Sequence, residues 1–335
     1  HCQWCRRLSE LRKLKPGKVL CVKRLYVLTL GLLVLLCACT PGTSEKKVEA
    51  APTAAPLQTL SPDSDGSPEE SAPATVTING ETFAYDGFRV LEPECDLDIY
   101  SMEPKDFTDD FNTVYECQRE SYQLTPETET ETTVVRITGQ EPGPTVYIAA
   151  GIHGDERAAW FAGLMLQKIT IRAGTLYVLS PANAKGAKVV SRMVGEEDPN
   201  RCFPGQEDGT EAQRLCYAIF HDIEEKAPEQ LLDMHEAIVY KEGRDFLGST
   251  LIYSSLDGMQ DMFFDLLFAT QAGEVTSTSF GYNGPGPAGS MNRTITDQLH
   301  IPSITVETFR GFPIERRVKD QLKVAAYVLR YKGML

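Results

Sequence analysis

Four ionisable residues stand directly after apolar stretches that read as β-strands. His153 and Glu156 follow the first stretch, His235 follows the second, and Glu307 follows the third. The carboxyl ends of strands in an open α/β sheet meet at one crevice, so we expect these side chains to lie together in the fold. Two histidines and one carboxylate are typical ligands of a catalytic zinc ion, which keeps a further position for water. Glu307 would then be placed to take a proton from that water.

Each of these signals also has an ordinary structural interpretation. An H-x-x-E pattern such as that of His153 and Glu156 occurs by chance in many proteins. A single histidine at the end of a strand is more often a hydrogen-bonding residue than a metal ligand. Asp233 lies two residues before His235, on the same face of a strand, and is a candidate to orient its ring. Taken alone, the four residues leave the metal site as a hypothesis.

A wider pattern joins these residues to other parts of the chain. Five segments occur in a fixed order: G-I-H-G-D-E at 151–156, N-A-K-G-A-K-V-V-S-R at 183–192, D-P-N-R-C-F-P-G at 198–205, L-L-D-M-H-E at 231–236 and I-P-S-I-T-V-E-T at 301–308. In these segments the sequence resembles the succinylglutamate desuccinylase/aspartoacylase family of zinc deacylases, which are relatives of the zinc carboxypeptidases. The D-x-N-R-x-F-P-G segment is the most specific of the five.

The resemblance implies a metal centre and a catalytic base. By this resemblance one Zn²⁺ is held by His153, Glu156 and His235. Glu307 is implied as the base that deprotonates water and then protonates the leaving amine.

The resemblance also implies three residues that contact the substrate. Asn200 and Arg201 match a pair that binds a substrate carboxylate, for which the planar guanidinium of arginine is well suited. Arg192 matches an arginine that stabilises the negative oxygen formed beside the metal. Surface ion pairing in an acidic protein is the alternative interpretation of both arginines.

The pattern of apolar residues predicts an α/β fold. The expected strands are residues 133–137, 145–150, 175–179, 231–234 and 303–308, and the expected helices are residues 157–169, 211–226, 259–270 and 316–331. Such alternation favours a largely parallel or mixed β-sheet with helices on both faces, and the resemblance implies the arrangement of the zinc carboxypeptidases. Before it, Asn79-Gly80 predicts the turn of a small β-hairpin within residues 76–85.

The N-terminal part of the chain reads as an export signal and a tether. An uncharged run at 25–36 follows basic residues and is too short to span a membrane as a helix. It ends in Leu36-Cys37-Ala38-Cys39, which resembles the lipobox of bacterial lipoproteins and makes Cys39 the candidate lipid anchor. A plain signal peptide or an uncleaved anchor is the alternative, and a start at Val22 would leave a compact signal.

Four regions follow from these signals. We predict a signal peptide at 1–38 that includes sequence upstream of the true start, and a disordered tether at 39–75, rich in Pro, Ser, Thr, Ala and Glu. A small N-terminal β region at 76–126 and a zinc hydrolase domain at 127–335 complete the chain. The protein is thus expected to be exported to a bacterial cell envelope and anchored to a membrane.

Charge and cysteine content limit the partners. The formal net charge is −14, and without residues 1–38 only 25 basic residues face 46 acidic ones. Because clustered Lys and Arg supply affinity for phosphate backbones, this excess of acid argues against nucleic-acid binding. An exported chain can oxidise its thiols, and a Cys95–Cys117 disulfide is compatible with the sequence but not established by it.

Three functions remain open at this stage. The first is a zinc amidohydrolase acting on an N-acyl amino acid or a related small substrate with a free carboxylate. The second is a zinc metallocarboxypeptidase or cell-wall peptidase, which export and the single helix expected after Glu307 would suit. The third is a ligand-binding lipoprotein without catalytic activity. Retention of the implied ligands, base and arginines argues against the third.

Overall fold

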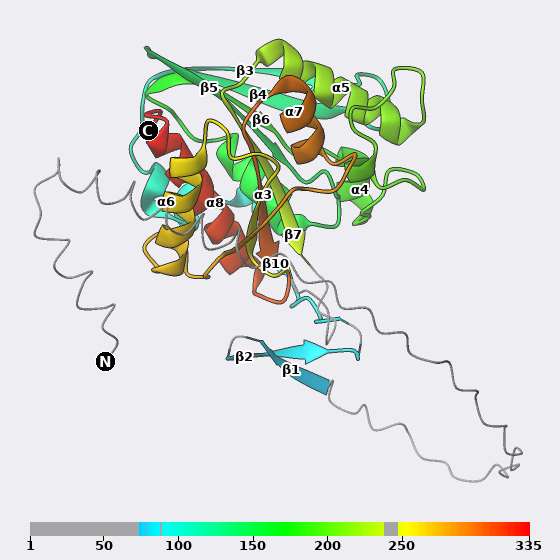
Figure 1. The fold of residues 1–335 in the computed structure, drawn as a ribbon, viewed down its shortest axis with the longest axis vertical. Coiled ribbons are helices and arrows are strands. Elements are labelled where there is room, and N and C mark those ends of the chain that lie inside the picture. Colours follow the sequence, from blue (N-terminus) through cyan, green and yellow to red (C-terminus); the bar gives the residue numbers. More distant parts are fainter. Residues whose placement is uncertain (1–73, 79, 88, 238–246) are drawn as a thin grey trace, which may run out of the picture. The chain divides into compact units, whose positions relative to one another are not determined.

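The computed structural model describes residues 74–335 except 79, 88 and 238–246 (Figure 1). The predicted signal peptide, the lipid anchor Cys39 and nearly all of the tether at 39–75 lie outside the described residues. The same holds for Asn79 of the predicted hairpin turn. The four described cysteines, Cys95, Cys117, Cys202 and Cys216, are free thiols. Among the described residues, no helix has both the length and the apolar character that crossing a membrane requires.

An eight-stranded mixed sheet forms the centre of the fold. Its strand order is β3-β4-β6-β5-β7-β10-β8-β9, and β6, β5, β7 and β10 run parallel to one another. The strands are β3 (Cys117–Leu124), β4 (Thr132–Gly139), β5 (Glu141–Ala150), β6 (Ala173–Leu179), β7 (Gln230–Ala237), β8 (Thr250–Tyr253), β9 (Gly281–Asn283) and β10 (Ser303–Phe309). The predicted α/β class with a mixed sheet is confirmed. The sequence pattern did not identify β3, β8 and β9.

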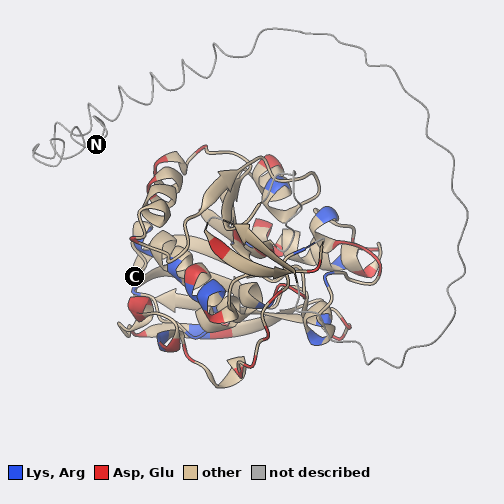
Figure 2. Ribbon diagram, turned by 90° about the horizontal axis from the view of Figure 1, so that it is seen from below, with Lys and Arg blue, Asp and Glu red and all other residues tan. Residues whose placement is uncertain are grey.

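Helices cover both faces of this sheet, as predicted. They are α3 (Arg157–Leu166), α4 (Ala184–Val189), α5 (Glu211–Lys226), α6 (Gln260–Gln271), α7 (Met291–Leu299) and α8 (Ile314–Tyr331). Helices α3, α6 and α8 lie on one face, and α5 and α7 lie on the other (Figure 1). Acidic and basic residues are mixed over these helices and loops rather than separated onto two faces (Figure 2).

The alternation of side chains along β5 explains why both faces are covered. Val146, Ile148 and Ala150 belong to the apolar cluster under α3, α6 and α8, whereas Tyr147 and Ala149 belong to the cluster under α5 and α7. Successive residues of a strand point to opposite faces, so the second half of β5, which is apolar on both faces, must be buried on both sides. This burial fixes the central strands and therefore the positions of the loops at their carboxyl ends.

A two-stranded antiparallel hairpin precedes the sheet. It consists of β1 (Ala74–Ile78) and β2 (Glu81–Tyr85). Phe83 of β2 packs edge-on against Phe309 and Phe312, with ring centroids 5.2 and 5.5 Å away. The chain then passes through three short 3-10 turns, Ile99–Ser101, Pro104–Asp106 and Asp109–Phe111, before it enters β3. The hairpin thus packs against the end of β10 and the turn that follows it.

The loop after β5 is in close contact with α4, and we predict that Gly154→Ala destabilises the protein strongly. A Cβ atom at Gly154 would lie 2.1 Å from the carbonyl carbon of Gly186 and 2.2 Å from the backbone nitrogen of Ala187. Backbone cannot move aside as a side chain can, so we expect a loss of about 3 kcal/mol in the free energy of unfolding. Urea unfolding measures it.

Gly273→Ala is the matched control for this substitution. Gly273 has a φ of +70°, but no atom of the described residues lies within 4 Å of the added Cβ atom. It should therefore lose only about 1 kcal/mol, from backbone strain alone. An equal loss at the two glycines would contradict the proposed contact between the loop and α4.

Candidate metal centre and catalytic site

Three of the predicted site residues meet in one buried cluster. His153 and Glu156 lie in the loop between β5 and α3, and His235 lies in β7. Nδ1 of His153 is 2.7 Å from Oε1 of Glu156, and Nδ1 of His235 is 2.9 Å from Oε2. One ligand atom from each of the three residues lies within 4.8 Å of the others. Two imidazole nitrogens and a carboxylate oxygen are a donor set that suits zinc and related divalent ions, so the residues fit a metal.

One aspartate contacts the far nitrogen of each histidine ring. Oδ1 of Asp198 is 2.9 Å from Nε2 of His153, and Oδ1 of Asp233 is 2.9 Å from Nε2 of His235. A carboxylate that accepts the Nε2 hydrogen fixes the orientation of the ring and leaves Nδ1 to face Glu156. Asp233 was a candidate for this role from its spacing. Asp198 opens the specific D-P-N-R segment, but its role here was not predicted from the sequence.

The charges of the cluster shift several pKa values. Burial lowers the pKa of His153 and His235, but the carboxylates of Glu156, Asp198 and Asp233 outweigh it and raise both. Burial likewise raises the pKa of Glu156, and the two histidines reverse this and hold it well below the usual range. The cluster therefore keeps Glu156 ionised, which is the form that binds a metal.

Glu307 lies beside the cluster on the neighbouring strand. It is in β10 and is the register partner of His235 in the parallel ladder with β7. Its Oε2 is buried and has no hydrogen-bond partner among the residues that the structure describes. Burial raises the pKa of Glu307 to about 7, although the nearby histidines partly oppose this. A carboxylate with a pKa close to neutral and a free oxygen is suited to general base catalysis.

Arg192 contacts both the cluster and its support. Its Nη1 lies 3.2 Å from Oε1 of Glu156, and its Nη2 lies 3.1 Å from Oδ2 of Asp198. The side chain is 39% exposed, so the guanidinium stands between the buried residues and solvent. The structure thus brings Arg192 to the predicted centre.

Asn200 and Arg201 occupy different surroundings. Oδ1 of the buried Asn200 accepts a hydrogen bond from the backbone N–H of Met291 at 2.9 Å, and its Nδ2 is 3.3 Å from Nε2 of His235. Arg201 is exposed and donates a hydrogen bond to the Asn200 carbonyl oxygen at 2.7 Å. The structure brings Asn200 to the cluster, while Arg201 remains at the surface. Their role in binding a carboxylate stays a prediction.

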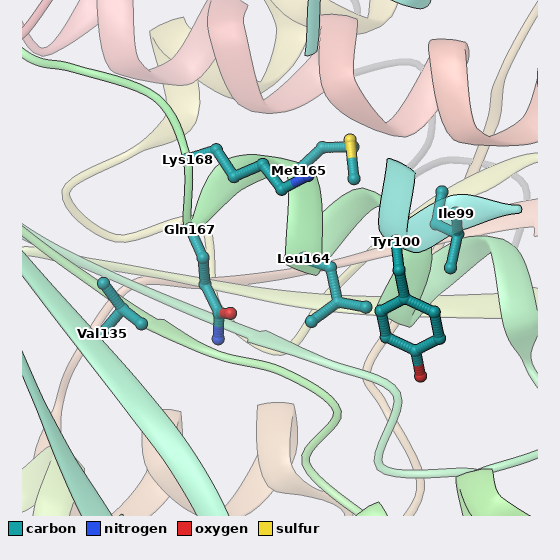
Figure 3. A pocket seen from close by; sticks show the side chains of 7 residues that line it. All are labelled: Ile99, Tyr100, Val135, Leu164, Met165, Gln167 and Lys168. Atoms are coloured by element: carbon teal, nitrogen blue, oxygen red, sulfur yellow. The ribbon is translucent and has the colours of Figure 1, made fainter. Parts of the chain in front are cut away.

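A pocket near the end of α3 is separate from the cluster of His153, Glu156 and His235. It has a volume of about 260 Å³ and is lined by the end of α3, the two residues after it, β4 and the segment before β3, with Ile99, Tyr100, Leu164 and Lys168 among its residues (Figure 3). Its lining is mostly apolar and includes none of the predicted site residues. We therefore assign the chemistry to the cluster at the strand ends.

Comparison with known proteins identifies a matching family. Residues 142–326 match the family described as the succinylglutamate desuccinylase/aspartoacylase catalytic domain. This range is more than half of the chain, and it contains every predicted site residue. None of the curated proteins compared with the chain by sequence matches it.

Solved structures share the fold at low sequence identity. A succinylglutamate desuccinylase from Silicibacter sp. TM1040 has 16% identity and a TM-score of 0.51 over 67% of this chain and 69% of its own. The product-bound ectoine utilization protein EutE (DoeB) from Ruegeria pomeroyi has 18% identity and a TM-score of 0.52, covering 66% and 68%. The tripeptide-bound cell shape determinant Csd4 from Helicobacter pylori has 15% identity and a TM-score of 0.51, covering 66% and 56%.

The raised pKa of Glu307 leads to a stability prediction for the metal-free protein. The folded chain holds this pKa at about 7, against 4.5 for an ordinary glutamate, so ionising Glu307 costs about 3 kcal/mol of stability. This penalty is absent below pH 4.5, grows as the pH rises, and is complete above about pH 7. We expect Glu307→Gln to be more stable than the wild type by about that amount at pH 8, as measured by urea unfolding with a chelator present.

The pH dependence provides the control. The advantage of Glu307→Gln should shrink steadily as the pH falls toward 4.5. Glu207→Gln changes an exposed glutamate and should leave the stability unaltered at each pH. Equal stability of wild type and Glu307→Gln at pH 8 would contradict the raised pKa of Glu307, whose Oε2 is buried without a partner among the described residues.

Proposed function

This chain belongs to the succinylglutamate desuccinylase/aspartoacylase family, and we propose that it is a zinc-dependent hydrolase of amide bonds. Its proposed substrate is an N-acyl amino acid or a related small molecule with a free carboxylate. The observation that carries the proposal is the position of Glu307. Its buried Oε2, which has no hydrogen-bond partner among the described residues, stands beside a cluster of two histidines and a glutamate that can hold a metal.

We propose that one zinc ion is held by His153, Glu156 and His235. Their three ligand atoms fit this ion in type and in mutual distance. Bound there, zinc would supply Lewis acidity, which polarises a carbonyl group and makes water easier to deprotonate. Asp198 and Asp233 would hold the two rings in the orientation that this requires.

Proton transfer is assigned to Glu307. Its carboxylate takes a proton from water as the water oxygen bonds to the amide carbon. It then gives that proton to the nitrogen as the carbon–nitrogen bond breaks, so the products are an acid and an amine. A pKa of about 7 in the chain without metal suits both halves of this transfer. Arg192, 3.2 Å from Glu156, is placed to stabilise negative charge on the carbonyl oxygen.

The substrate class rests on the basic residues around the cluster. Arg192 lies at the cluster and is partly exposed, so it can contact a carboxylate that enters from solvent, and we assign the exposed Arg201 of the D-P-N-R segment as a second such contact. A metallocarboxypeptidase or cell-wall peptidase would use the same residues on a peptide. We retain this second candidate because the tripeptide-bound structure from Helicobacter pylori shares the fold.

Export and membrane anchoring through Cys39 remain part of the proposal. They rest on the sequence alone, because Cys39 lies outside the described residues. We expect the wild-type chain in a bacterial host to carry lipid and to sediment with membranes, and Cys39→Ala to lose both properties. Fractionation and mass spectrometry of the N-terminal peptide measure this. Absence of lipid from the N-terminal peptide of the membrane-bound wild type would exclude lipid on Cys39 as the anchor.

The central experiment gives the full chain, loaded with zinc, a mixed panel of N-acyl amino acids and peptides. We expect release of an acid from N-acyl amino acids, read by mass spectrometry. Glu307→Gln should bind zinc normally and lose about 10²–10⁴-fold in turnover, because it cannot accept the proton. Loss of C-terminal residues from the peptides would instead support the peptidase.

Zinc content separates binding from catalysis in this experiment. His153→Ala removes one of the proposed ligands and should lose zinc together with activity. Full zinc occupancy in His153→Ala would remove this residue from the ligand set. Unchanged turnover in Glu307→Gln would exclude it as the base. Absence of product from every substrate, with zinc bound, would favour a ligand-binding protein without catalysis.

A further inference from the structure

A group of largely buried charged side chains connects the N-terminal segment to the metal residues, as we call His153, Glu156 and His235. At its centre is Glu92, which lies between the hairpin and β3 and has a side chain only 15% exposed. Its Oε2 accepts a hydrogen bond from Nη2 of Arg310 at 2.9 Å, and its Oε1 accepts one from Nη2 of Arg317 at 2.8 Å. Nη2 of Arg157 lies 3.4 Å from Oε1. Three guanidinium groups thus surround one carboxylate.

Arg310 continues this contact to the loop after β5. Its Nη1 donates to Oδ2 of Asp155 at 2.8 Å, and Asp155 immediately precedes Glu156. Its backbone N–H donates to the carbonyl oxygen of Ala237, at the end of β7, at 2.9 Å. The side chain of Arg310 is 6% exposed. Glu92 is therefore one guanidinium away from the segment that carries Glu156.

Arg317 makes the corresponding contact to β7. Its Nη1 donates to Oε1 of Glu236 at 2.5 Å, and Glu236 immediately follows His235. Oε2 of Glu236 accepts the backbone N–H of Ala158 at 2.8 Å, in the first turn of α3. The backbone N–H of Glu236 donates to Oε2 of Glu156 at 3.0 Å. Glu236 thus joins β7 to α3 at the metal residues.

Charge balance shows what Glu92 contributes. Three guanidiniums, of Arg157, Arg310 and Arg317, face three carboxyl groups, of Glu92, Asp155 and Glu236. Burial raises the pKa of Glu92, but the guanidiniums of Arg310 and Arg317 outweigh it and lower the pKa, so Glu92 is ionised at neutral pH. Without Glu92, two buried guanidiniums lose a partner and one positive charge is left beside a centre that must attract a cation.

We propose that Glu92 is a positioning residue of the metal centre. Through Arg310 and Arg317 it fixes the segments that carry Glu156 and His235, and it cancels positive charge behind them. This inference rests on the proposed function, because it requires that the cluster hold a metal. The N-terminal segment then supports the site through these two arginines, although it lies outside the residues that match the family.

A purely mechanical link is the competing explanation, and the chain offers matched controls for it. Glu81 of β2 also pairs with α8, because its carboxylate lies 3.0 and 3.2 Å from the guanidinium of Arg316. That pair is more exposed, and its described contacts do not lead to the metal residues. Phe83 holds the hairpin against Phe309 and Phe312 without any charge.

The experiment measures zinc affinity of the full chain by competition with a chromophoric chelator. We expect Glu92→Gln to weaken zinc binding about 10-fold, the lower end of what partners in direct contact with ligands cause. Glu81→Gln should change it less than 2-fold. Phe83→Ala should lower the thermal unfolding temperature of the metal-free protein while keeping the zinc affinity within 2-fold of the wild type.

Each outcome is decisive. Wild-type affinity in Glu92→Gln overturns the inference and leaves the proposed function intact. An equal loss in Phe83→Ala also overturns it, since any loosening of the hairpin would then suffice. If the wild-type chain itself binds no zinc, the proposed function and the inference fall together.

Hydrogen–deuterium exchange of the wild-type chain gives a second measurement, which does not depend on the folding of a variant. Coupling between two sites is reciprocal, so zinc should slow backbone exchange at residues 90–95, around Glu92. Exchange in β3, at the far edge of the sheet, should not change. Unchanged exchange at residues 90–95, with zinc bound, would overturn the inference.

Discussion

The carboxylate of Glu156, held between two histidine rings, is the interaction on which the rest of the site depends. Its oxygens lie 2.7 Å from Nδ1 of His153 and 2.9 Å from Nδ1 of His235, and its side chain is 2% exposed. A buried carboxylate is tolerated only where charges and hydrogen bonds compensate for the lost water. Glu156 is also the N-cap residue of α3 and accepts the backbone N–H of Glu236. The loop after β5, the end of β7 and the start of α3 therefore meet at one side chain.

This constraint explains why the surroundings of the cluster are so rich in paired charges. Asp198 and Asp233 hold the far nitrogens of the rings, and Arg192 spans Glu156 and Asp198. On the other side, Arg310 pairs with Asp155 and Arg317 with Glu236, the residues next to Glu156 and His235, and both arginines also contact Glu92. Breaking one partner of such a pair leaves an uncompensated buried charge, which is far more costly than losing a surface ion pair. The precision of the site therefore comes from its ionic support as much as from the sheet.

Sequence alone could predict the parts that follow a repeating pattern. The apolar runs before His153, His235 and Glu307 are central strands, and their ends meet because parallel strands share a carboxyl edge. Glu92 carried no such signal, since the segment around it has no period and its contacts with Arg310 and Arg317 span more than 200 residues. Strand β9 was equally hidden, because three exposed residues show no apolar pattern. Contacts of this kind are fixed by the tertiary fold rather than by local preference.

If Glu307 is the base that we propose, stability and chemistry oppose each other at this residue. Its Oε2 is buried without a hydrogen bond among the described residues, and burial raises its pKa to about 7. A carboxamide in its place would remove that penalty, so the fold gains nothing from keeping a carboxylate there. The penalty is maintained because the neighbours on both sides of Glu307 are fixed. Its register partner His235 is tied to Asp233 and Glu156, and its strand is closed on the other edge by β8. A rigid frame of this kind can hold one unsatisfied group in a reactive state, whereas a softer one would let it turn toward solvent or a new partner.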